Sequence, residues 1–209
     1  MKNRNATIAI IDYDLGNTKS VSNAIQYLGY KTIITSEQEI LAKADILILP
    51  GVGAFEEAMK SINAKKLDKI LNELVIKEQK PIIGICLGMQ LLATHSEENG
   101  LFEGLNFIEG EIKKIIPTHK VSVPHVGWND LQCDGNSILF KNLLESKNFY
   151  FDHSFYFDCN KKYVSSSCNY GGLEITASVQ KNNIFGVQFH PEKSHNNGLR
   201  LFRSFIENI

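Results

Sequence analysis

A cysteine between two glycines, at the end of a short apolar run, is the feature that most narrows the folds open to this chain. Residues 81–85 read Pro-Ile-Ile-Gly-Ile, which is typical of a strand buried in a parallel sheet, and residues 89–93, Met-Gln-Leu-Leu-Ala, favour a helix. Cys86 therefore lies where a strand turns into a helix. Gly84 and Gly88 flank it, as a turn too sharp for larger side chains requires. We expect an outward-pointing nucleophile whose thiolate the start of the helix favours.

A histidine and a glutamate after a second apolar run supply the base that such a thiol needs. Residues 184–189 read as a strand that Pro191 closes, and His190 and Glu192 share a face in extended chain. If they meet Cys86 in the fold, the three predict nucleophilic acyl chemistry, with Glu192 fixing the histidine tautomer. Each half alone has a plainer interpretation, an inert buried cysteine or a surface His–Glu pair. The two together favour a catalytic site.

A third segment offers backbone donors. Residues 46–49 are an apolar strand that runs into Pro-Gly-Val-Gly and then a helix. Glycine lets main-chain N–H groups approach a developing oxyanion closely. A Gly-x-Gly turn is equally compatible with a phosphate loop or a simple bend.

The order of elements predicts an α/β fold in one domain, residues 1–209, with a mostly parallel sheet between helices. Strands are expected near 7–12, 31–35, 46–49 and 82–85, and helices near 17–28 and 65–79. Short aromatic strands from about 105 to 190 indicate an antiparallel extension, and residues 198–206 a closing amphipathic helix. Active residues should gather at the carboxyl ends of the parallel strands.

Composition excludes several classes of function. The chain has 209 residues, 43% hydrophobic, and a net charge of −1 from 22 basic and 23 acidic residues, with no basic stripe for nucleic acid. No apolar run approaches the roughly eighteen residues that cross a bilayer, and the start of the chain has no leader pattern, so we expect a cytoplasmic protein with no membrane partner. The four cysteines lack C-x-x-C spacing and are expected to be free thiols; the six histidines lack paired ligand spacing. We expect no metal and no cofactor.

Three motifs together carry a family resemblance. Leu49-Pro-Gly-Val-Gly53, Gly84-Ile-Cys-Leu-Gly-Met-Gln90 and Gly186-Val-Gln-Phe-His-Pro-Glu-Lys-Ser194 resemble class I (triad) glutamine amidotransferases, whose fold is flavodoxin-like. A further set is similar to a narrower group, the glutaminase subunits of imidazole glycerol phosphate synthase: Ile11-Asp-Tyr, Gly16-Asn17, Pro124-His-Val-Gly-Trp-Asn129, His153-Ser154 and Gly198-Leu-Arg-Leu201. The resemblance covers nearly the whole chain.

The resemblance implies a role for particular residues. Cys86 would attack the side-chain amide of glutamine, His190 would pass the proton to the leaving ammonia, and Glu192 would orient His190. The expected oxyanion-hole amides are those of Gly51, Val52 and Leu87. The expected glutamine-binding residues are Gln90, Ser154 and Phe155.

The resemblance also implies a partner, because ammonia must reach its acceptor unprotonated. Similar subunits form a heterodimer with a (β/α)8-barrel synthase (HisF-like), and Trp128 and Lys193 match positions that face it. Asp14 and Asp152 depart from the family pattern, which has glycine and an apolar residue there, and this leaves the partner open. The alternatives are a synthase that aminates a surface-polysaccharide sugar, and a non-catalytic regulatory subunit with the same fold. An intact Cys86, His190 and Glu192 counts against the latter.

Overall fold

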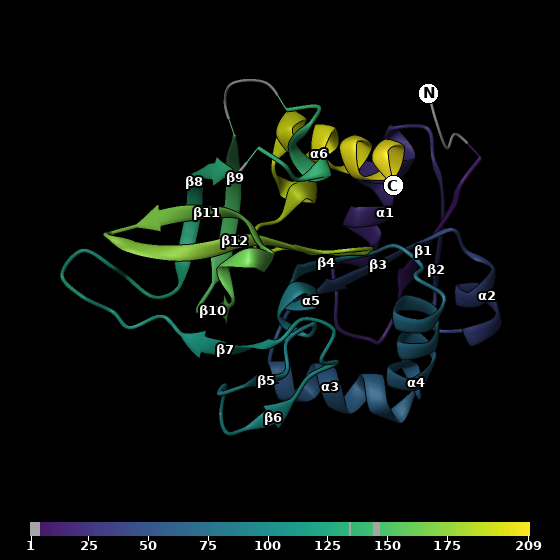
Figure 1. The fold of residues 1–209 in the computed structure, drawn as a ribbon, viewed down its shortest axis with the longest axis horizontal. Coiled ribbons are helices and arrows are strands. Elements are labelled where there is room, and N and C mark those ends of the chain that lie inside the picture. The colour runs from purple at the N-terminus through teal and green to yellow at the C-terminus, as the bar shows by residue number, and fades with distance from the viewer. Residues whose placement is uncertain (1–4, 134, 144–146) are drawn as a thin grey trace.

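A nine-stranded mixed sheet runs through the computed structural model, which describes residues 5–133, 135–143 and 147–209 (Figure 1). Its first strands pair in parallel up to β13, and from β13 onward each pair is antiparallel. In spatial order the strands are β2 (Lys31–Thr35), β1 (Thr7–Ile11), β3 (Ile46–Gly51), β4 (Ile82–Cys86), β13 (Ile184–Val187), β12 (Leu173–Lys181), β11 (Val164–Tyr170), β8 (His125–Cys133) and β9 (Asn148–His153). The expected parallel sheet with an antiparallel extension is confirmed.

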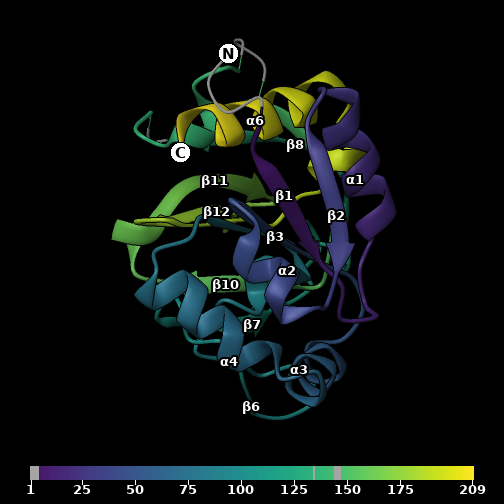
Figure 2. The ribbon, with the colours of Figure 1, turned by 90° about the vertical axis from the view of Figure 1, so that its right-hand side faces the viewer.

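Strands β1, β3 and β4 are buried on both faces because helices cover each side, as Figure 2 shows, whereas the edge strand β2 is mostly exposed. Ile8 and Ile10 of β1 pack in one hydrophobic cluster with α1 (Thr18–Tyr27) and α6 (His195–Asn208). Ala9 and Ile11, on the opposite face, pack with α2 (Gln38–Lys43), α3 (Phe55–Ala64) and α4 (Leu67–Leu71). The period-two alternation of side chains along the strand thus divides the core into two layers.

Two helices before β4 differ from expectation. The periodicity over 65–79 predicts one helix, but α4 is followed by a π-helical segment, Asn72–Lys77. In that segment the Val75 carbonyl accepts a hydrogen bond from the Asn183 side-chain amide at 2.8 Å. Helix α2 is too short to show a clear period and was not expected. Within the described residues, no helix combines the length and apolar surface needed to cross a bilayer.

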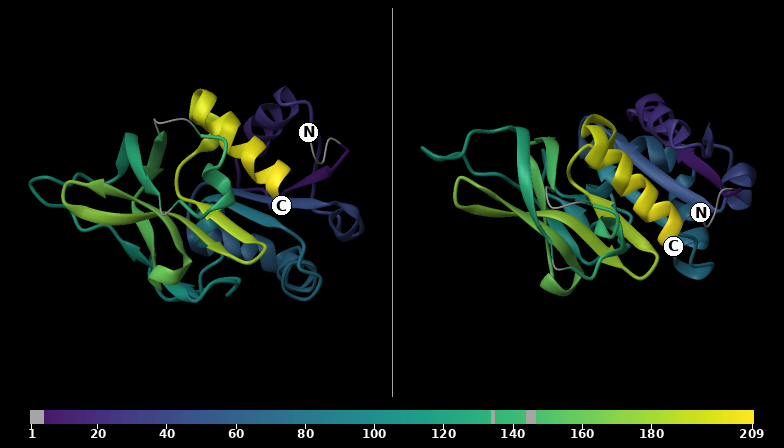
Figure 3. Two further views of the ribbon diagram at one scale, coloured as in Figure 1. Left: turned by 45° about the horizontal axis from the view of Figure 1, so that its top comes forward. Right: turned by 90° about the horizontal axis from the view of Figure 1, so that it is seen from above.

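A second, four-stranded sheet packs beneath the antiparallel part, as Figure 3 and Figure 1 show from different sides. Its order is β10 (Phe155–Cys159), β7 (Gly110–Lys114), β5 (His95–Ser96) and β6 (Phe102–Glu103). Strands β5 and β7 pair in parallel, and β5 and β6 lie before residue 105, where the sequence predicted no strand. Strands β9 and β10 therefore continue one segment of chain from the large sheet into the small one.

Candidate active site

The turn at Cys86 has the shape that its glycines predict. Cys86 ends β4 and precedes the one-turn helix α5 (Leu87–Gln90), and its backbone lies at φ 55° and ψ −111°, where few non-glycine residues are found. A Cβ on Gly88 would lie 1.7 Å from the Leu49 carbonyl oxygen, and one on Gly84 would lie 2.5 Å from that of Gly88. Both positions therefore require glycine. Cys86 is only 6% exposed, and that exposure is toward a cavity.

The sheet brings the histidine and the glutamate to this cysteine. Strand β13 pairs with β4 in a register that sets Val187 opposite Ile85, so the segment after β13 lies beside Cys86. His190 Nδ1 lies 2.8 Å from Glu192 Oε1, and His190 and Cys86 line the same cavity. Asn17 Nδ2 donates to the same glutamate oxygen at 3.3 Å, which holds the carboxylate in place. The three candidate catalytic side chains thus converge.

His190 carries a positive charge in this setting. Burial is the largest influence and lowers its pKa, but the hydrogen bonds and charges of Cys86 and Glu192 together outweigh burial and raise the pKa to about 10. An imidazolium next to a sulfur favours its thiolate form. By contrast, burial raises the pKa of Cys159 and of Cys168 to about 12, so both remain neutral thiols at neutral pH.

Two further groups contact the sulfur. Gln188 Nε2 lies 3.7 Å from Cys86 Sγ, and the Asp152 carbonyl oxygen lies 3.8 Å from it. Gln188 is completely buried. It stands inside the sequence motif of His190, but spacing alone does not reveal that its side chain reaches Cys86.

The expected oxyanion-hole residues surround Cys86. Gly51 is the register partner of Cys86 across β3 and β4, while Val52 and Leu87 line the cavity. The buried Tyr13 hydroxyl donates to the Pro50 carbonyl at 2.7 Å and so holds the peptide that precedes Gly51. Burial, with a smaller contribution from Cys86, raises the Tyr13 pKa, so this hydroxyl stays protonated.

The cavity has a volume of about 340 Å³ and opens beside the sulfur. The expected glutamine-binding residues Gln90, Ser154 and Phe155 all line it. So does Glu98, which the sequence did not single out because it lies in a loop without a motif. Its Oε2 accepts the backbone N–H of Phe55 at 2.8 Å, at the start of α3. The helix dipole stabilises a carboxylate at this position, and Glu98 therefore places a negative charge in the lining of the cavity.

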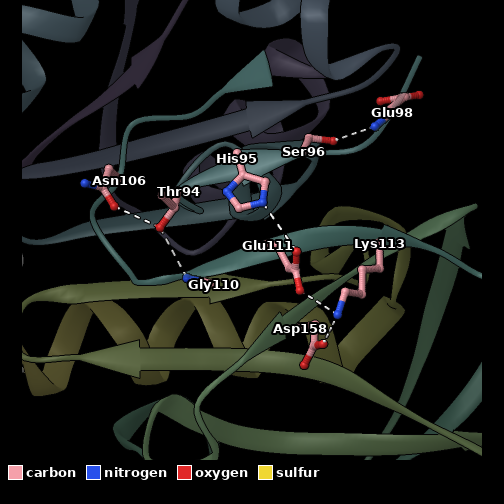
Figure 4. A network of polar contacts seen from close by, with 9 residues as sticks. All are labelled: Thr94, His95, Ser96, Glu98, Asn106, Gly110, Glu111, Lys113 and Asp158. Atoms are coloured by element: carbon pink, nitrogen blue, oxygen red, sulfur yellow. Dashed lines mark hydrogen bonds and ion pairs between the residues drawn. The ribbon is translucent and has the colours of Figure 1, made fainter. Parts of the chain in front are cut away.

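A polar network links strands of the small sheet, with Glu98 beside it (Figure 4). Glu111 on β7 pairs with His95 on β5 at 3.3 Å and with Lys113, which reaches Asp158 on β10 at 2.7 Å. At the end of β5, the Ser96 hydroxyl accepts the Glu98 N–H at 3.1 Å and fixes the start of the loop that carries Glu98. The network therefore joins the strands that carry two walls of the cavity.

A buried pair of histidines lies under Phe155. His153 Nδ1 lies 2.8 Å from the Phe155 carbonyl, which can only accept, so Nδ1 carries the proton and Nε2 is an acceptor. His125 Nδ1, 2.9 Å away, must then donate to that Nε2. Burial lowers the pKa of His153 to about 3 and that of His125 to about 4. Both rings are neutral and locked in one tautomer.

An exposed aromatic surface lies at the rim of the cavity, and we define it as Trp128, Tyr150, Lys193 and His195. Trp128 is 46% exposed and stacks on His195 with ring centroids 5.2 Å apart. Tyr150 packs edge-on against Trp128, and Lys193 Nζ lies 5.5 Å from the centre of the Tyr150 ring. Lys193 also lines the cavity, so this aromatic surface is continuous with the site.

The two departures from the family pattern have structural explanations. Asp14 lies at φ 71°, the left-handed region that glycine adopts freely, and its carboxylate pairs with Lys65 at 2.9 Å. Asp152 is exposed and lines the cavity, and it contacts the sulfur only through its backbone carbonyl. Neither side chain contacts the three candidate catalytic residues.

Comparison with known proteins places this geometry in a family. The family model for class-I glutamine amidotransferases matches residues 9–208. The chain is 49% identical over 96% of its length to imidazole glycerol phosphate synthase subunit HisH 2 of Vibrio vulnificus, covering 94% of that protein. It is 45% identical over 95% of its length to subunit HisH 1 of Campylobacter jejuni, covering 98% of it. Among solved structures, PurLQS from Thermotoga maritima superposes with a TM-score of 0.75 at 19% identity, over 96% of this chain and 97% of that one.

Proposed function

This chain belongs to the class I glutamine amidotransferase family, and we propose from that premise that it is the glutaminase subunit of an imidazole glycerol phosphate synthase in histidine biosynthesis. It hydrolyses glutamine to glutamate and passes ammonia to a synthase subunit that makes imidazole glycerol phosphate and AICAR. The observation that supports the reaction best is the contact of His190 with both Cys86 and Glu192 at the cavity. On this proposal residues 1–209 form one amidotransferase domain that works in the cytoplasm without a metal or cofactor.

The first half of the reaction forms a thioester. The Cys86 thiolate attacks the side-chain amide carbon of glutamine, and the N–H groups of Gly51, Val52 and Leu87 stabilise the oxyanion. The His190 imidazolium gives its proton to the amide nitrogen as the C–N bond breaks, so the leaving group is neutral ammonia. A glutamyl thioester remains on Cys86 and His190 is left neutral.

The second half regenerates the enzyme. Neutral His190 takes a proton from water, and the resulting hydroxide attacks the thioester carbon. The tetrahedral intermediate collapses, breaks the C–S bond and releases glutamate, which returns Cys86 to thiolate and His190 to its cation. Glu192 remains ionised and keeps the Nδ1 proton in place throughout.

Substrate recognition uses both charge and shape. Gln90, Ser154 and Phe155 hold the amide end and backbone of glutamine near the sulfur. Glu98 supplies the negative charge that a free amino acid's ammonium group needs, which distinguishes glutamine from a glutamine residue within a peptide.

The synthase subunit docks on the aromatic surface. That surface exposes Trp128 and packs it against Tyr150, both of aromatic types enriched at interfaces, and lies next to the cavity in which ammonia is released. A (β/α)8 barrel in a heterodimer with this chain keeps water away from ammonia, which loses its nucleophilic lone pair when it is protonated. Lys193, at the cavity rim, lies where partner and site meet.

A second candidate partner is a synthase that aminates a surface-polysaccharide sugar. Asp152 supports it, because an exposed carboxylate replaces the family's apolar residue at the cavity rim. The glutaminase chemistry is the same for both partners.

Reconstitution tests the proposal. Mixing the protein with a candidate barrel synthase should raise glutamate release severalfold, and further when the nucleotide substrate is added.

Cys86→Ser should abolish glutamate release, whereas Cys159→Ser, away from the cavity, should not. Trp128→Ala should weaken activation by the synthase and leave the basal rate unchanged. Glutamine turnover by Cys86→Ser would contradict the assigned nucleophile, and activation only by a sugar synthase would favour the second partner.

A further inference from the structure

Gln188 is buried beside Cys86, but the steps of the proposed reaction do not use it. We propose that Gln188 is a positioning residue whose side-chain amide donates a hydrogen bond to Cys86 Sγ and stabilises the thiolate that attacks glutamine. The proposal rests on the proposed function for the reaction, but its effect on the sulfur can be measured without substrate.

The direction of the hydrogen bond follows from a neighbouring carbonyl. Gln90 Nε2 is 3.0 Å from the Phe155 carbonyl oxygen, and since a carbonyl only accepts, the group facing it must be the NH₂ of Gln90. The same nitrogen lies 3.0 Å from the Gln188 side chain, so the atom it meets there must be the oxygen, Oε1. Nε2 of Gln188 is then the atom that faces Sγ at 3.7 Å.

The amide has little freedom to turn away. Gln188 is 0% exposed, and its backbone N–H is held by the Ala177 carbonyl at 2.8 Å. Flipping the amide would set two NH₂ groups against each other at Gln90 and would leave the sulfur facing an oxygen. Both changes cost free energy in a buried site, so one orientation is fixed.

The two contacts of the sulfur suit different ionisation states. A neutral thiol can donate its S–H to the Asp152 carbonyl, 3.8 Å away. A thiolate has no proton to donate and is repelled by that oxygen, but it accepts strongly from the N–H of Gln188. Gln188 therefore favours the charged form over the neutral one.

The test uses the conservative substitution Gln188→Glu. It keeps an oxygen that accepts from Gln90 and removes the donor to the sulfur, but it also adds a negative charge, which a second variant must control for. The thiolate absorbance of Cys86, corrected with Cys86→Ser for the other cysteines and tyrosines, should titrate about one pH unit higher in the variant than in the wild type. The kcat for glutamine should fall about tenfold with KM little changed, as expected for loss of a hydrogen bond to a charged group.

Matched variants separate the donor from other effects. Gln180→Glu makes the same change on neighbouring β12, where the Gln180 oxygen accepts from Ser137 at 2.7 Å, and should leave the thiolate titration unchanged. Gln188→Met also lacks the donor but carries no charge, so it should shift the titration in the same direction as Gln188→Glu. A shift in Gln188→Glu alone would assign the effect to the new charge and overturn the proposal, as would no shift in either variant.

A measurement on the unsubstituted protein does not depend on how well the variants fold. The side-chain amide proton resonance of Gln188 should move with the same midpoint as the thiolate absorbance, because its hydrogen-bond partner gains charge. A resonance that does not change across the thiolate titration would overturn the proposal. Absence of glutaminase activity in the wild type would instead contradict the proposed function, and the ionisation measurements would still test the role of Gln188.

Discussion

The protonation state of each buried histidine near the site has an identifiable physical cause. His190 is a cation because Cys86 and Glu192 outweigh its burial, while His125 and His153 are neutral because burial is the largest influence on both. The sequence predicted Cys86, His190 and Glu192, since a motif marks each of them. It could not predict Gln188 or Glu98, because their contacts depend on strands and loops that meet only in the folded chain.

Glu192 sets the alkaline limit of activity. Glu192→Gln keeps the size of the side chain but removes the negative charge of Glu192, which acts together with Cys86 to raise the His190 pKa to about 10. The descending, alkaline side of the kcat profile should therefore move to lower pH, and kcat at neutral pH should fall at least tenfold, as for loss of a charge-assisted hydrogen bond. Initial rates of glutamate release across pH test this. An alkaline limit equal to that of the wild type would contradict it.

Glu98 should act on binding more than on chemistry. Glu98→Gln retains an oxygen for the Phe55 N–H but loses the charge that we assign to the glutamine ammonium. We expect KM for glutamine to rise about tenfold with kcat changed less, the size of a hydrogen bond between charged groups. Glu97→Gln, on the exposed neighbour, is the control and should behave as the wild type. Equal KM values in both variants would remove Glu98 from the binding site.

The strand–turn–helix around Cys86 depends on close contact between backbones. The sequence predicted helical structure to Ala93, but α5 ends at Gln90, because the carbonyls of Leu91, Leu92 and Ala93 accept hydrogen bonds from residues 105–108 instead. Likewise, the π-helical segment after α4 follows from Asn183, more than a hundred residues later in the chain. Local periodicity contains no information on such distant partners.

The tightness of this turn can be measured by substituting its glycine. Gly88→Ala would bring a methyl group 1.7 Å from the Leu49 carbonyl oxygen, so backbone must move. We expect a loss of more than about 3 kcal/mol in the free energy of unfolding, or an insoluble chain. Gly29→Ala, at φ +89° with nothing within 4 Å, should cost only about 1 kcal/mol for its left-handed backbone. Urea denaturation of both variants compares them, and similar losses would contradict the close contact.

The whole chain combines a parallel half that presents the nucleophile with an antiparallel half that supplies the aromatic surface and one wall of the cavity. The alternation of elements predicted the first half well, because parallel strands between helices leave a strong pattern. The pairing of the small sheet was harder to predict, since β5 and β6 are two residues long. Very short strands carry no measurable periodicity.

The buried histidine pair makes stability depend on pH. The pKa values of His125 and His153 fall from about 6.5 in the unfolded chain to about 4 and 3 on folding, so as pH falls below about 6.5 the unfolded chain binds protons that the folded chain does not. The free energy of unfolding should fall by up to about 1.4 kcal/mol per ring for each pH unit in that range. The raised pKa of His190 acts oppositely, and its contribution is lost as pH rises through about 10.

Urea midpoints at neutral and mildly acidic pH test this dependence. The wild type should lose stability on acidification, and His125→Asn should lose less, because one of the two buried rings is gone. His119→Asn, which removes an exposed histidine, should retain the wild-type slope. Identical slopes in all three proteins would show that the buried pair does not control acid stability.

The pairing of β4 with β13 has a consequence for the cell. Thiol and imidazole stand at the ends of two adjacent strands whose residues are about a hundred positions apart in the chain. A chain still emerging from the ribosome that has not reached β13 lacks the ladder that joins these strands, and its cysteine has no histidine beside it. The complete site therefore requires the chain to be synthesised past Glu192.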